Sequence, residues 1–448
     1  MLTRRQFLES GCAVAGVSGA AALLGDARAE IPARAPEYRA LVCIALGGGA
    51  DSFNMLVPTD ASRYRSYAKR RGTLALSRNE LLPLRRGNGD GRSYALHNGM
   101  REVQELYSAG EVALLANTGP LHGRNRRQGG CRAPDLSHSD FIARWHFGTA
   151  DHRSRSGWAG RVADVLADCG WQDRLPTNVS LSGRNVMQLG ARTAAVNLRS
   201  SPFRQCSGLP VGVDFSYLNE QLAERAISAG RPGDIREKSR LLEKAETESS
   251  LIVEDAVAST PALKTRFSPD SFSANLQQVA RVIAARSKLG VRRQIFFVHF
   301  DGWDHHHKLL ESQAMMLPML SRGLQAFRDA LIEHDAFDDV TTFTVSEFGR
   351  ALESNGSGSD HGWGGHHIVM GGAVNGGNIY GDYPILSASN PLDVGRGIYA
   401  PTMAVDQYFA ELALWFGVPV SELDQVLPNV REFYSPESGD PPVGFLSA

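Results

Sequence analysis

Short apolar runs alternate along this chain with longer amphipathic stretches, and this alternation is the feature that most narrows the possible folds. Residues 40–46 form one such run, which is apolar at every position and ends in three consecutive glycines. A strand without polar alternation is typical of a parallel sheet that is covered by helices on both faces. We therefore predict an α/β fold with a mainly parallel central sheet. The other predicted strands lie at 112–116, 177–181, 294–300 and 340–345, and the predicted helices at 100–108, 141–147, 273–289, 309–334 and 401–416.

The N-terminus has the features of an export signal. The pair Arg4 and Arg5 is followed by an uncharged stretch at residues 11–24 and by an Ala-Arg-Ala sequence at residues 27–29 that is typical of a cleavage site. The uncharged stretch is shorter than the roughly 20 apolar residues that a membrane helix needs. We therefore predict a twin-arginine (Tat) signal over residues 1–29, a Tat translocase as export partner, and a periplasmic or secreted protein without a stable membrane span after cleavage.

The remaining chain, residues 30–448, is predicted to form a single α/β domain with a charged helical insertion at about 215–260. The charge of the full chain of 448 residues is balanced, because 47 Lys and Arg face 48 Asp and Glu, which argues against a nucleic-acid partner. The glycine run at 47–49 lacks both the Lys-Ser/Thr of a phosphate-binding loop and the spacing of a dinucleotide fingerprint. We therefore expect no nucleotide cofactor.

Acidic and imidazole side chains follow three of the predicted strands, and more lie in a predicted loop at 359–367. Eight of the 13 histidines fall between residues 299 and 367. Ligands of open α/β sheets bind beyond the carboxyl ends of the strands, and carboxylate oxygens and imidazole nitrogens are ligands of divalent metals. We therefore predict a site for one or two divalent ions, with zinc as a candidate; a competing interpretation is that these clusters are solvated turns. The candidate ligands are Asp51, Asp301, Asp304, His305, His306, Glu347, Asp360 and His361.

Two serines and one arginine are candidates for roles in catalysis. Ser137 and Ser139 directly precede a predicted helix, where they can serve as simple N-caps. At the same place, a serine could use the backbone N–H groups of the helix to bind an anionic oxygen and, beside a metal, act as a nucleophile. Arg350 follows a predicted strand, so its guanidinium could bind an anionic substrate or form an ion pair with Glu347 or Glu353.

A series of motifs runs through most of the chain, at residues 48–58, 137–138, 145–149, 157–161, 302–306, 346–350, 358–364, 406–408 and 415–417. Taken in order, these motifs resemble the bacterial exported family named domain of unknown function 1501. That family resembles the alkaline phosphatase and sulfatase superfamily, which implies an α/β fold with a metal site at the strand ends.

The resemblance also implies roles for individual residues. Asp51 resembles the metal-binding aspartate after the first strand, and two later ligand pairs resemble Asp304 with His306 and Asp360 with His361. Phe348 stands where the superfamily would have a histidine, which leaves Glu347 as the extra carboxylate. The pair Asp301 and His305 offers an alternative register, and Thr118 and Ser52 are alternative nucleophiles.

Two functions are compatible with these features. The first is a metal-dependent hydrolase of phosphate or sulfate esters, with a small anionic ester as substrate. The second is a non-catalytic periplasmic binding or scaffold protein that retains the fold, which the phenylalanine at position 348 and the unassigned nucleophile favour.

Overall fold

The structure is a computed structural model that describes residues 37–85, 91–121, 135–148, 155–171, 173, 175–193, 195–198, 220–224, 227 and 247–447. Residues 36–448 cluster as one compact unit. The predicted signal at 1–29 and most of the predicted insertion lie outside the described residues, although 220–224 and 247–258 are helical. Within the described ranges, no helix is long and apolar enough to cross a membrane.

The central sheet is built around β1 (Arg39–Gly47), which pairs in parallel with β8 (Arg293–Asp301) on one side and β9 (Val340–Ser346) on the other. Among the described strands of this sheet, only β12 runs antiparallel to its neighbours. The prediction of a mainly parallel α/β fold is therefore confirmed. The strand order is β13 (Ile379–Tyr380), β5 (Val112–Gly119), β12 (Gly365–Met370), β9, β1, β8, β6 (Asn178–Ser180) and β7 (Val196–Asn197), and β14 (Met403–Ala404) pairs with β5.

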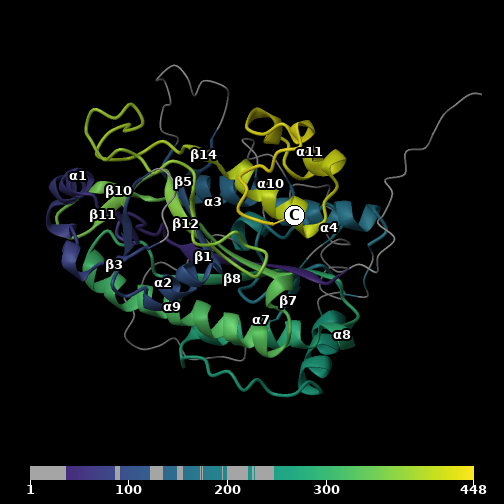
Figure 1. Cartoon of the computed structure of the whole chain (residues 1–448). Coiled ribbons are helices and arrows are strands. Elements are labelled where there is room, and N and C mark those ends of the chain that lie inside the picture. Colours follow the sequence, from purple (N-terminus) through teal and green to yellow (C-terminus); the bar gives the residue numbers. More distant parts are fainter. Residues whose placement is uncertain are drawn as a thin grey trace, which may run out of the picture. The chain divides into compact units, whose positions relative to one another are not determined.

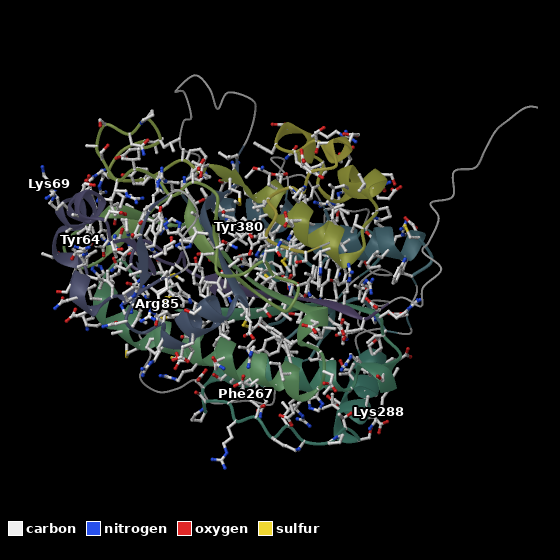
Figure 2. The ribbon with its side chains drawn as sticks, in the orientation of Figure 1. Tyr64, Lys69, Arg85, Phe267, Lys288 and Tyr380 are labelled. Carbon is white, nitrogen blue, oxygen red and sulfur yellow. The ribbon has the colours of Figure 1, made fainter. Side chains whose placement is uncertain are left out.

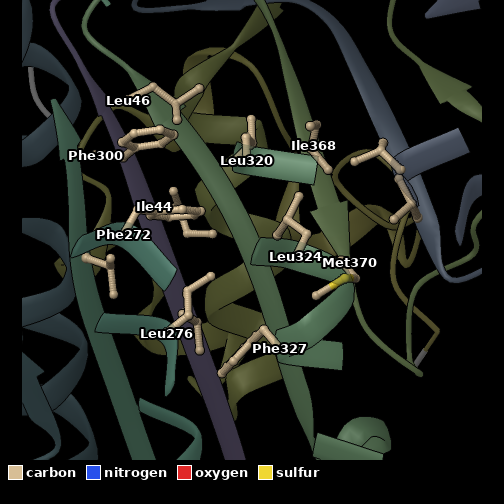
Figure 3. Packing of buried hydrophobic residues seen from close by; sticks show 14 of the residues in the cluster. Ile44, Leu46, Phe272, Leu276, Phe300, Leu320, Leu324, Phe327, Ile368 and Met370 are labelled. Atoms are coloured by element: carbon tan, nitrogen blue, oxygen red, sulfur yellow. The ribbon is translucent and has the colours of Figure 1, made fainter. Parts of the chain in front are cut away.

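Helices cover both faces of this sheet (Figure 1). On one face, Ile44 and Leu46 of β1 pack against side chains of α7 and α9, as Figure 3 shows. On the other face, Leu41 and Cys43 pack with residues of α4 and α10. Residues 40–46 are therefore apolar at every position because successive side chains enter two different cores. The helices are α2 (Arg101–Ala109), α7 (Ser271–Ala284) and α9 (Leu309–Glu333) on the first face, and α3 (His138–Phe147), α4 (Trp158–Asp168) and α10 (Val405–Phe416) on the second.

Smaller elements surround the ends of the strands. A hairpin of β10 (Arg350–Ser354) and β11 (Ser359–His361) follows β9, and it packs beside α1 (Ala61–Arg71). Charged side chains such as Lys69 and Lys288 point outward from the unit (Figure 2). The remaining elements are a sheet of β2 (Leu56–Pro58), β4 (Tyr94–Leu96) and β3 (Leu82–Pro83), and the short helices α8 (Arg286–Leu289) and α11 (Leu423–Val426).

The strand β12 corrects the prediction of a continuous loop at 359–367. Residues 365–370 are all buried between β5 and β9. Burial lowers the pKa of both His366 and His367 to about 3, so these two imidazoles are neutral residues of the core. The Gly-His-His sequence is typical of a turn. The residues that follow it are apolar, however, and the segment is a buried strand of the sheet.

A buried carboxyl group in α10 makes the stability of the fold depend on pH. Burial raises the pKa of Asp406 from 3.8 to about 7, although Arg161 lowers it in part. Because the folded state holds this proton more tightly than the unfolded chain, the wild-type protein should lose stability as the pH rises from about 4 to 7. At pH 8 we expect Asp406→Asn to be more stable than wild type by up to about 4 kcal/mol, and at pH 4 we expect little difference.

Denaturant unfolding at several pH values measures this effect. Asp168→Asn is the control, because Asp168 is an exposed carboxylate on α4 that pairs with Arg192 at the surface. If the curves of wild type and Asp406→Asn run parallel between pH 4 and pH 8, the buried carboxyl does not titrate in this range.

Candidate metal centre

Polar side chains gather where the carboxyl ends of β1, β8 and β9 meet. The strands are in register, so that Gly47 lies opposite Asp301 and Leu46 opposite Ser346. The turn after β8 carries Asp304, β11 carries His361, and the first turn of α3 carries His138. One ligand atom from each of these three side chains lies within 4.8 Å of the other two.

Asp304 is the centre of this group. Its Oδ1 lies 3.1 Å from Nε2 of His306 and 3.6 Å from Nε2 of His361, and its Oδ2 lies 3.7 Å from Nε2 of His138. The Nε2 atoms of His306 and His361 are 2.9 Å apart. Each of these three imidazole nitrogens therefore lies within 3.7 Å of an oxygen of the Asp304 carboxylate.

The other ring nitrogen of each imidazole has its own partner. Nδ1 of His361 donates to the carbonyl of Leu136 at 2.7 Å, and Nδ1 of His138 contacts the carboxylate of Glu347. Nδ1 of His306 lies 3.4 Å from Oδ1 of Asp360. Such outer partners hold the Nδ1 proton and direct the Nε2 lone pair at a metal. The donor set of three nitrogens and one oxygen fits zinc in number and kind.

The electrostatics favour the protonation states that metal ligands need. Burial raises the pKa of Asp304, but His361 and Arg350 outweigh it and hold that pKa well below its usual range. Burial and the charge of Arg350 lower the pKa of His306. At neutral pH, Asp304 is therefore ionised and His306 is neutral.

Phe348 occupies the position at which the family resemblance implied a histidine. Its ring stacks on His361 at 4.3 Å between ring centroids and lies 5.0 Å from the ring of His138. The side chain is buried. Phe348 therefore supports two candidate ligands from behind instead of contributing one.

Arg350 is not placed to bind a substrate. Its side chain is buried, and its guanidinium donates to the carbonyls of Gly48, Gly49 and Ser359 at 2.6, 2.8 and 2.7 Å. It also forms an ion pair with Asp304, and not with the glutamates considered from the sequence. Arg350 therefore anchors Asp304 to the loop after β1.

Asp51 lies apart from the converging ligands. Its carboxylate is fully buried in an ion pair with Arg71 of α1, and its Oδ1 accepts from the backbone N–H of Phe53 at 3.1 Å. The role of Asp51 is thus structural, because the buried guanidinium of Arg71 requires a negatively charged partner.

Of the two possible registers after β8, the structure brings together Asp304 and His306. Asp301 instead accepts from Nδ1 of His299 at 2.9 Å. His305 is buried beside Trp303, and desolvation lowers the pKa of His305 to about 4.

The carboxylates of Glu347 and Asp360 each contact the outer ring nitrogen of a converging histidine. Glu347 contacts His138 and also accepts from the backbone N–H of Gly48 at 3.0 Å. Asp360 accepts from Asn355 at 2.9 Å, and this hydrogen bond, with the ion pair to Arg396, lowers the pKa of Asp360. Both are therefore positioned to orient histidines.

The candidate nucleophiles differ in their placement. Ser137 precedes His138 at the start of α3, and its Oγ lies 3.3 Å from the carboxylate of Asp135, while Ser139 is exposed. The hydroxyls of Ser52 and Thr118 are buried, with partners in β12 and β14. Of these four residues, only Ser137 lies between Leu136, whose carbonyl accepts from His361, and His138, which is itself one of the converging imidazoles.

His138 is the functional candidate that the sequence analysis missed as a ligand. It lies between Asp135 and Asp140 in a sequence that was interpreted as the N-cap of a helix. The sequence feature that could have identified His138 as a ligand is the Ser-His motif at 137–138. Only the fold shows that this motif lies beside the strand ends.

The fold and the site together define an α/β protein with a possible His/Asp metal centre at the carboxyl ends of its strands. Residues 217–413 match the model of the family described as protein of unknown function (DUF1501). This match confirms the family resemblance over a span that includes Asp304, Glu347 and His361. No curated protein matches the chain.

Solved structures with a similar arrangement include sulfatases and phosphatases. Ps i-CgsB in complex with k-i-k-neocarrahexaose is 10% identical, with 89% of this chain and 77% of that chain covered and a TM-score of 0.38. The PsFucS1 sulfatase from Pseudoalteromonas sp. is 10% identical, with 85% and 68% covered and a TM-score of 0.34. Alkaline phosphatase from the Antarctic bacterium TAB5 is 10% identical, with 75% and 91% covered and a TM-score of 0.25.

Proposed function

We propose that this protein is a metal-dependent hydrolase of phosphate or sulfate esters. The observation that carries the proposal is the convergence of three Nε2 atoms on Asp304, each from a ring whose Nδ1 has a separate partner. A divalent ion such as zinc, once bound, would supply Lewis acidity toward an ester oxygen and make water a better nucleophile at neutral pH.

The protein's own residues divide the remaining work. Asp304 and the three histidines bind the ion, while Glu347 and Asp360 orient two of the rings. Phe348 closes the back of the centre and excludes water there. His306 has the most exposed side chain of the four proposed ligands, at 35%. An ester would therefore approach from the side of His306.

The second candidate is a non-catalytic protein with a structural ion. One observation favours it: four protein donors are enough to complete a tetrahedral zinc site, whereas catalytic sites keep one position for water or substrate. In the hydrolase, His306 is the ligand best placed to yield that position, because it is the most exposed.

Hydrolysis assays separate these two functions. The mature chain, purified after export, is tested with aryl phosphate, phosphodiester and aryl sulfate esters before and after treatment with a chelator. We expect one ester class to be cleaved, the activity to fall at least about a hundred-fold on chelation, and zinc to restore it, because one ion can lower the barrier by several kcal/mol. Bound metal without any metal-dependent hydrolysis would support the structural ion instead, and a protein that takes up no metal would rule out both.

We also propose that residues 1–29 direct export through the Tat pathway to the periplasm or the medium. The support is the Arg4-Arg5 pair, the uncharged stretch after it and the Ala-Arg-Ala sequence at 27–29.

A further inference from the structure

The loop between β13 and β14 presents one exposed arginine beside the proposed metal centre. Nη1 of Arg396 lies 2.7 Å from Oδ2 of Asp360, the carboxylate whose other oxygen faces Nδ1 of His306. The side chain of Arg396 is 55% exposed, whereas that of Arg350 is fully buried. Within the described part of the chain, the Arg396 side chain forms no other hydrogen bond or ion pair.

The backbone at Arg396 is strained. Its φ is +56°, a conformation that L-residues with long side chains rarely adopt, and it stands between Gly395 and Gly397, which also have positive φ. An exposed ion pair contributes little to stability, so the pair with Asp360 does not compensate for this strain. Strained positions that the surrounding structure holds in place are concentrated at functional sites.

The surrounding structure holds this loop firmly. The carboxylate of Asp393 accepts from the backbone N–H groups of Gly395 and Gly397 at 2.9 and 3.0 Å. Asp393 is itself fixed by an ion pair with Arg70, at 2.7 Å. The carbonyl of Arg396 accepts from the backbone N–H of Glu353 in β10 at 3.3 Å. The loop is therefore braced on α1 and on the hairpin that carries His361.

We propose that Arg396 binds an anionic oxygen of the substrate at the rim of the metal centre, on the exposed side of His306. This inference rests on the proposed function and deepens it, because it assigns recognition of the phosphate or sulfate group to a particular guanidinium. The planar guanidinium offers paired donors that match two oxygens of a tetrahedral anion. Arg350, which the sequence suggested for this task, has its donors engaged by the protein.

The test is the binding of inorganic phosphate and inorganic sulfate, measured by calorimetry on the full chain with and without zinc. We expect Arg396→Ala to weaken the binding of one of these anions about ten- to a hundred-fold, with the zinc content unchanged. Arg396→Gly removes the side chain and also fits the positive φ, so it should show the same loss without strain. Arg396→Lys should lose less affinity for the anion, because it keeps the positive charge but not the paired donors of the guanidinium. Arg431→Ala is the matched control, since Arg431 is 51% exposed and also holds surface carboxylates.

The outcomes separate this inference from the proposed function. If Arg396→Ala and Arg396→Gly bind both anions as tightly as wild type does, or if wild type binds neither anion, Arg396 is not an anion-binding residue. If the metal-free protein binds the anion through Arg396 but takes up no zinc, the inference stands and the proposed hydrolase fails. Equal losses in Arg396→Ala and Arg431→Ala would indicate a general charge effect and would also overturn the inference.

Discussion

Replacing His361 with alanine should lower the affinity of the protein for zinc by more than about a hundred-fold. Loss of an outer partner typically costs 10- to 100-fold in metal affinity, and loss of a ligand should cost more. His361 contributes an Nε2 atom 3.6 Å from Asp304, and its Nδ1 proton is already held by a backbone carbonyl. Zinc content by mass spectrometry and competition with a chromogenic chelator measure the effect.

Two further variants make this expectation specific. His307→Ala is the matched control, because His307 is an exposed neighbour of His306 whose Nδ1 lies 3.3 Å from Ser357, outside the centre. Glu347→Gln should weaken zinc binding by about ten-fold, since it removes the charge that orients His138 but keeps the shape. Zinc retained in full by His361→Ala would mean that the four side chains do not form a metal centre.

Asp51→Ala should destabilise the fold by about 3–5 kcal/mol, because it leaves the guanidinium of Arg71 buried without a negative partner. The zinc content per folded molecule should not change, because Asp51 pairs with Arg71 and not with Asp304 or the histidines. Denaturant unfolding measures the first quantity and metal analysis of the folded protein measures the second.

Comparison variants test the cause of this loss. Asp60→Ala removes a half-buried ion pair with Arg63 at the start of α1 and should cost less than Asp51→Ala, because the side chain of Asp60 is 29% exposed and that of Asp51 is fully buried. Asp51→Leu combined with Arg71→Met replaces the buried pair by apolar side chains and should recover much of the stability. If Asp51→Ala instead removes the zinc and leaves the stability unchanged, Asp51 is a ligand, as the family resemblance implied.

The fold was predictable because residues 40–46 are apolar throughout, and because residues 294–300 and 340–345 are rich in β-branched and aromatic side chains. Residues 40–46, 294–300 and 340–345 are buried on both faces, and periodicity alone distinguishes them from the amphipathic helices. The antiparallel β12 was not predictable in this way. Its histidines look polar in sequence, and only their position between β5 and β9 makes them neutral core residues.

The site was predictable in part. Asp304, His306 and His361 were found because they follow strands or lie on one short turn, which are local features. His138 and the pairing of Asp51 with Arg71 were not found, because both depend on contacts between distant segments. Arg350 begins β10 and Arg396 lies in the loop between β13 and β14, and burial distinguishes the anchor from the exposed group.

The proposed ligands come from α3, from the turn after β8 and from β11, and His138 is 209 residues from Glu347, the residue that orients it. No short peptide of this chain contains the full donor set, so the ion cannot nucleate folding as it does in a zinc finger. The sheet has to close before the centre exists. The fraction of molecules that hold one equivalent of zinc would then report how much of a preparation has completed its long-range assembly, which secondary structure content alone does not reveal.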